Sequence, residues 1–61
     1  MTIEINLIVK HNGEYKLVEY GYIHNGSLNN FDYDETMKEC IEDAKGYYKT
    51  DIVKLSSIQI K

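Results

Sequence analysis

The sequence contains no proline, no tryptophan, no arginine and a single cysteine, Cys40. One cysteine cannot form an internal disulfide, and no group of cysteines and histidines has the spacing of a zinc site. We therefore predict that the protein holds no metal ion and no cofactor. A domain of 61 residues buries only about 60% of the surface that its unfolded chain exposes, so its own core is small. A homodimer or a bound partner remains as a source of added stability.

Positive charge is also scarce, because ten acidic side chains outnumber seven lysines and the net charge is −3 at pH 7. This balance argues against a protein that binds nucleic acid by neutralising phosphates. The missing arginine removes the side chain most used for reading bases. No apolar run approaches the roughly 18–20 residues of a membrane span. Residues 1–10 lack the pattern of a signal peptide, so we expect a cytosolic protein.

Apolar residues occupy the odd positions of residues 3–9, which predicts a strand with one apolar face. Asn12-Gly13 then gives the strongest short signal for a two-residue hairpin turn, because both central residues need positive φ. The turn places apolar residues of the second strand on the same face, so two independent signals agree on the register. The predicted pairs are Ile3–Tyr22, Ile5–Tyr20, Leu7–Val18 and Val9–Lys16.

A second Asn-Gly step, Asn25-Gly26, predicts a second hairpin. Its register would pair Tyr20 with Phe31 and Val18 with Tyr33, on the same apolar face. We therefore expect a third strand that completes an antiparallel meander.

A helix follows, with Asp32 or Asp34 as its N-cap. Its apolar residues fall at helical spacing and form one stripe: Met37, Cys40, Ile41, Ala44 and Tyr48. Cys40 lies on this stripe, which favours a buried structural thiol over a reactive one. Gly46 either ends the helix or weakens its interior.

Residues 52–61 are predicted to form a last strand, whose alternation slips at Ser56-Ser57. A β-bulge or a late strand start would explain the slip. A strand–helix–strand unit favours a parallel, right-handed crossover, so we expect this strand to run parallel to the first or the third. The predicted fold is a single α+β domain over residues 1–61, of order β-β-β-α-β, with a mixed four-stranded sheet and the helix on one face.

The sequence offers no catalytic constellation. His11 and His24 precede turns at opposite ends of the meander, where we expect exposed residues that cannot meet. Ser56-Ser57 lacks a nucleophile-elbow context, and the isolated glycines form no phosphate-binding loop. A catalytic carboxylate pair needs a pocket that separates the pKa values of its two groups. We predict that the protein is not an enzyme.

Two surfaces remain as candidates for binding. The first is an acidic stretch on the helix, flanked by Tyr47: Asp32, Asp34, Glu35, Glu39, Glu42 and Asp43. It is either a solvated helix face or a docking surface for a basic partner. The second is the sheet face opposite the helix, where Ile8 and Leu17 are cross-strand partners beside Tyr15. This spot is either unremarkable or the seed of a dimer or partner contact.

The strand and helix order, together with the helix opening Asp34-Glu35-Thr36-Met37-Lys38-Glu39-Cys40, resembles HicB-type antitoxin domains. The resemblance implies a partial RNase H-like fold. The proline- and glycine-rich segment that such domains carry before the helix is replaced here by Ser27-Leu28-Asn29-Asn30. We expect no appended DNA-binding segment, and no functional residue is carried over.

The function predicted from the sequence is that of a small, non-enzymatic, protein-binding inhibitor or modulator. It would block a basic, nucleic-acid-binding surface of a host protein through the acidic helix. The richness in Ile, Asn, Lys and Tyr suggests an AT-rich phage or mobile element as the source. The alternative is an antitoxin-like or regulatory dimerisation domain that uses a sheet edge or the open sheet face.

Overall fold

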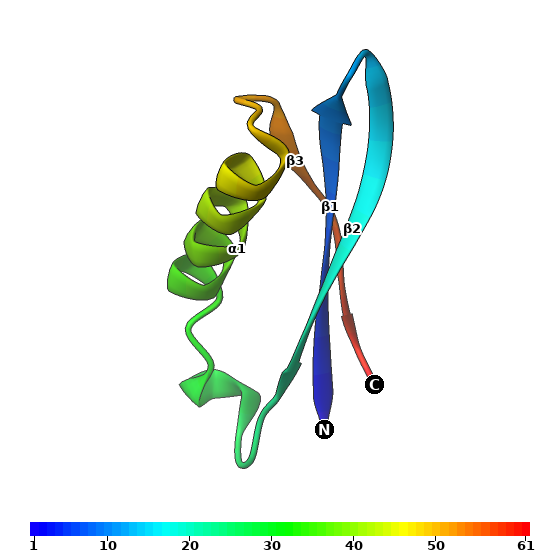
Figure 1. Ribbon diagram of the computed structural model, residues 1–61. Coiled ribbons are helices and arrows are strands. Elements are labelled where there is room, and N and C mark those ends of the chain that lie inside the picture. Colours follow the sequence, from blue (N-terminus) through cyan, green and yellow to red (C-terminus); the bar gives the residue numbers. More distant parts are fainter.

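The computed structural model describes residues 1–61 and contains a three-stranded sheet with one helix packed on one face (Figure 1). Its elements are β1 (Thr2–His11), β2 (Glu14–Ile23), the 3₁₀ turn η1 (Leu28–Asn30), α1 (Tyr33–Tyr48) and β3 (Val53–Ile60). The strand order is β2-β1-β3, and both neighbouring pairs are antiparallel. The central strand β1 is therefore the only one with a neighbour on each side.

The first hairpin forms as the sequence predicts. Asn12 and Gly13 have φ values of 52° and 78°, the positive values that a two-residue hairpin turn requires. All four predicted pairs are confirmed, from Ile3–Tyr22 to Val9–Lys16. The odd-numbered residues of β1 consequently face the helix.

The prediction of a second hairpin was wrong. Gly26 does have a positive φ of 102°, but the chain then leaves the sheet and forms η1. The Ser27 hydroxyl accepts a hydrogen bond from the Asn29 amide over 3.2 Å, and Asp32 caps α1 directly afterwards. Short polar side chains that bind nearby amides compete with strand pairing, and here they replace the expected third strand. Phe31 still packs against the aromatic side of the core, with its ring 4.8 Å from that of Tyr33.

The prediction that the last strand runs parallel to its neighbour was also wrong, because β3 pairs antiparallel with β1. With the third strand absent, the strand that precedes α1 is β2. Both β2 and β3 are antiparallel to β1, so they are parallel to each other with β1 between them. The crossover preference thus applies to β2 and β3. The sheet has three antiparallel strands, in place of the mixed sheet of four that we predicted.

The slip in the alternation of β3 is a β-bulge. Asn6 pairs with Ser57, whereas the next residue, Leu7, pairs with Leu55, which leaves Ser56 as the extra residue. The bulge keeps the apolar residues on both sides of it on the helix-facing side of the sheet. The sequence had left two alternatives open, a bulge and a late strand start, and the structure shows the bulge.

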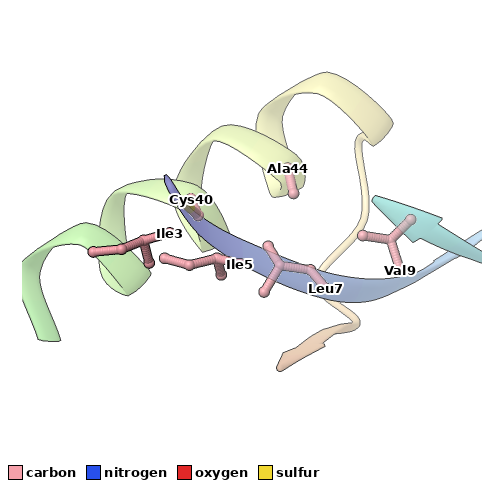
Figure 2. Packing of buried hydrophobic residues seen from close by; sticks show 6 residues of the cluster. All are labelled: Ile3, Ile5, Leu7, Val9, Cys40 and Ala44. Carbon is pink, nitrogen blue, oxygen red and sulfur yellow. The ribbon is translucent and has the colours of Figure 1, made fainter. Parts of the chain in front are cut away.

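The helix begins after Asp32, whose carboxylate accepts a hydrogen bond from the Glu35 amide over 3.0 Å. It continues through Gly46 and ends at Tyr48, followed by Lys49 in the left-handed conformation. Figure 2 shows the row of β1 side chains pointing toward the helix. Six fully buried apolar residues form one core cluster: Ile3, Ile5, Leu7, Val9, Cys40 and Ala44.

Candidate functional site

One flank of α1 faces β2 and carries three of the six acidic side chains that the sequence singles out. The Tyr20 hydroxyl of β2 donates a hydrogen bond to the Asp43 carboxylate over 2.7 Å, which fixes this side of the helix. Glu39 and Glu35 lie four and eight residues before Asp43, so they continue the row along the same flank. Tyr47 extends it by one more turn and is 79% exposed. We call these four residues, Glu35, Glu39, Asp43 and Tyr47, the acidic flank.

The acidic flank has no ion pair. The one salt bridge in the structure joins the Lys61 ammonium to the Glu4 carboxylate, 3.2 Å apart, at the far ends of β3 and β1. Like charges four residues apart destabilise a helix by roughly 0.2–0.5 kcal/mol per pair. The helix dipole favours Glu35 in the first turn, but its effect does not reach Glu39 and Asp43. Apart from the hydrogen bond from Tyr20 to Asp43, the fold supplies no cation that offsets the repulsion along the row.

Two tyrosines beneath the acidic flank remain protonated at neutral pH. Burial, reinforced by the hydrogen bond to Asp43, raises the pKa of Tyr20 above its usual value. The contact between the Tyr22 hydroxyl and the Cys40 thiol, 2.9 Å apart, together with burial, raises the pKa of Tyr22 to about 12. Tyr20 therefore acts as a hydrogen-bond donor that positions Asp43.

The opposite flank of α1 faces β3 and has a different charge pattern. It forms an open groove of about 330 Å³ whose lining mixes charge signs with two apolar side chains. The residues are Asp34, Met37, Lys38, Ile41, Glu42 and Lys45. Glu42 thus lies beside lysines, and because it follows Glu35 by seven residues it also borders the acidic flank on the exposed side of the helix. We call this set the alternating flank.

The open sheet face has the pairing predicted from the sequence, with Ile8 opposite Leu17 and Lys10 opposite Tyr15. These apolar side chains are accessible, since Ile8 is 37%, Leu17 60% and Tyr15 68% exposed. The Lys10 ammonium lies 5.7 Å from the centre of the Tyr15 ring. Asn6 is buried on this face, and its side-chain oxygen has no hydrogen-bond partner. The face is therefore apolar near the hairpin and polar at its centre.

Both histidines are half-buried and engaged in contacts, contrary to the expectation of exposed turn residues. The Nε2 of His11 accepts a hydrogen bond from the side-chain amide of Asn12 over 3.2 Å. Its Nδ1 therefore carries the proton and donates to the Tyr48 carbonyl over 3.0 Å. His11 thereby ties the hairpin to the end of α1, beside an open hollow of about 450 Å³. His24 lies 2.8 Å from the Ser27 carbonyl and packs edge-on against Phe31. Their spacing in the sequence contains no signal for these contacts.

No group of three or more potential metal ligands lies together in the structure. The helix is neither long enough nor apolar enough to cross a membrane. Comparisons with protein-family models, with curated proteins and with solved structures found no match. The resemblance to HicB-type antitoxin domains stays a prediction.

Proposed function

We propose that the protein is a non-enzymatic, protein-binding module that docks the acidic flank of α1 onto a basic surface of another protein. The observation that carries this proposal is the unpaired row Glu35, Glu39 and Asp43 on one exposed side of the helix. A row of like charges lowers the stability of the free protein. A partner that supplies the missing cations would remove this repulsion upon binding.

The chemistry of the acidic flank suits lysine and arginine side chains. Carboxylates accept charge-assisted hydrogen bonds from both cations, and arginine binds them through two parallel bonds. Tyr47 adds an exposed ring, whose centre is 4.8 Å from that of Tyr48. An aromatic face binds cations and is common among residues that dominate interfaces. Tyr47 is therefore the expected anchor at the end of the acidic row.

A basic surface on a partner is frequently a nucleic-acid-binding surface. Occupying it with carboxylates would exclude phosphates from the same site, so the module would inhibit or modulate the partner. We attribute the gene to a phage or mobile element on the ground of its composition, which is rich in Ile, Asn, Lys and Tyr.

The alternative function is an antitoxin-like or regulatory domain that dimerises through a sheet edge or the open sheet face. The observation in its favour is the exposure of Ile8, Tyr15 and Leu17, which adjoin one another on that face. Mutation of Ile8 to Asp would abolish a dimer built on this face and would leave a dimer built elsewhere unchanged.

Affinity capture with three immobilised chains tests the proposed function. The wild type is compared with Glu35→Lys/Glu39→Lys and with the matched control Glu14→Lys/Glu19→Lys, which makes the same charge change on exposed residues of β2. We expect a basic protein from the source cell to bind the wild type and the control, and to bind the helix variant at least about tenfold more weakly. Equal losses in both variants would show that net charge, and not the acidic flank, governs binding.

A further inference from the structure

The alternating flank is complementary to its own reverse. Its charges follow one another along α1 in the order negative, positive, negative, positive: Asp34, Lys38, Glu42 and Lys45. Read from the other end, the order is positive, negative, positive, negative. Two such flanks that meet antiparallel therefore place an opposite charge at every position.

The margin of β3 beneath this flank is apolar and uncovered. Leu55 and Ile60 pair with Leu7 and Ile3, which places them on the sheet face that α1 covers. They are nevertheless 41% and 49% exposed, because β3 is an edge strand with no neighbour on its outer side. An apolar strip thus extends outward from the core at this edge.

We propose that a second copy of this chain binds along this side, so that the protein forms a two-fold symmetric dimer. The axis is perpendicular to the sheet, which keeps both helices on the same face and brings the two β3 edges together. Asp34 of one copy then lies opposite Lys45 of the other, and Lys38 lies opposite Glu42. Each pair occurs twice, as a two-fold interface requires.

The dimensions of the fold allow this arrangement. The helix packs over β1 and β3, and adjacent strands lie about 4.8 Å apart. An axis centred between β1 and β3 would lie about 4.8 Å from a midline drawn between two adjacent β3 strands. In the proposed dimer the two helices would then be about 10 Å apart, close to the 8–10 Å of packed helices. Met37 and Ile41 meet across the seam, and Leu55 and Ile60 fill the space below it.

A second copy fits this surface better than an unrelated protein does, because the alternating charges are complementary to those of a reversed copy of the same flank. The acidic flank, by contrast, has one sign and would repel its own copy. The bulge at Ser56 interrupts regular pairing at the β3 edge. Side chains of the helices and of the β3 margin therefore supply most of the contact.

Sedimentation equilibrium on the full chain tests this dimer. The wild type is expected at twice its 7.1 kDa at micromolar concentration. Lys38→Glu/Lys45→Glu makes the flank wholly acidic, and Asp34→Lys/Glu42→Lys makes it wholly basic. Each variant alone should raise the dissociation constant at least about tenfold, because like charges then meet across the axis. An equimolar mixture of the two should restore the dimer mass.

Circular dichroism checks that every variant keeps its helix, and restoration by mixing separates loss of contact from loss of fold. Two controls should leave the dimer unchanged: Glu35→Lys/Glu39→Lys on the acidic flank and Leu17→Asp on the open sheet face. The proposal is overturned by a monomeric wild type, by a dimer that survives the alternating-flank variants, by a mixture that stays monomeric, or by a dimer that only Leu17→Asp dissociates. Partner capture by the acidic flank is measured separately, so failure of one proposal does not decide the other.

Discussion

The two flanks of α1 carry different sets of charged residues. On the β2 side, acids recur every four residues without a lysine among them, and one is held by Tyr20. On the β3 side, acids and lysines alternate above an exposed apolar margin. A single-sign row calls for a partner of opposite charge, whereas an alternating row is satisfied by its own reversed copy. The two surfaces thus differ in the sign of their charges and in the order in which these charges follow one another.

Both flanks depend on one small core, and removing part of it should abolish the difference between them. Ile5 is fully buried at the centre of that core. We expect Ile5→Ala to lower the free energy of unfolding by roughly 2–5 kcal/mol, through lost burial and the cavity left behind. Urea unfolding followed by circular dichroism measures the change. The matched control is Ile23→Ala, at a residue 84% exposed, which should change stability by less than about 0.5 kcal/mol. Equal effects at both positions would contradict the assignment of the core.

High pH should lower the free energy of unfolding through Tyr22, which contacts α1 from β2. The pKa of Tyr22 is about 12 in the folded protein, above the usual tyrosine value of 10.0. Between these values the unfolded chain releases the proton while the folded protein retains it, so stability is complete below about pH 10 and falls as pH rises toward 12. Urea unfolding from pH 9 to pH 11.5 should show this decline. Tyr22→Phe should make the decline shallower, and an unchanged slope would remove Tyr22 as its cause.

The hydrogen bond to Asp43 distinguishes positioning of the acidic flank from mere negative charge. We expect Tyr20→Phe to lower the free energy of unfolding by about 1 kcal/mol, because a typical hydrogen bond contributes that much. Partner capture should weaken and the dimer mass should stay the same. Tyr15→Phe, at a residue 68% exposed on the open face, is the control and should alter neither property. A loss of dimer in Tyr20→Phe would show that the two flanks are not independent.

The smallest expected effect is a gain. Gly46 lies inside α1, and a Cβ added there meets no atom within 4 Å. Gly46→Ala should raise the free energy of unfolding by roughly 0.5–1 kcal/mol, since alanine loses less conformational freedom in a helix. Thermal unfolding measures the gain, and both capture and dimer mass should be unchanged. A decrease in stability would indicate that the helix is distorted at this residue.

The first hairpin was predictable because two local signals, the turn dipeptide and the alternation, specify one register. The same dipeptide at Asn25-Gly26 led to the wrong prediction of a second hairpin. The alternation of Phe31 and Tyr33 fits a strand as well as it fits a chain that enters a helix. Capping by Ser27 and Asp32 decided between them. The predicted direction of the last strand relied on a third strand before the helix. Because that strand is absent, this prediction was wrong as well.

The acidic residues were predictable as a group, but the placement of Asp43 toward β2 and of Asp34 and Glu42 beside lysines was not. Spacing alone grouped Glu42 with Glu35 and Glu39, since all three are close on a helical projection. The contact between Tyr20 and Asp43 shows which side faces β2, and such a contact between distant residues leaves no signal in the sequence. Lys38 and Lys45 lie with Asp34 and Glu42 on the alternating flank, and the proposed dimer gives these lysines a role that the sequence did not suggest.

Native mass spectrometry of the complex with a captured partner tests most directly whether the two flanks bind separately. We expect the wild type to give a complex of two copies of the chain with the partner. We expect Glu35→Lys/Glu39→Lys to give two copies of the chain without the partner. A spectrum in which this variant loses its second copy, or keeps the partner at wild-type abundance, would contradict the separation of the flanks.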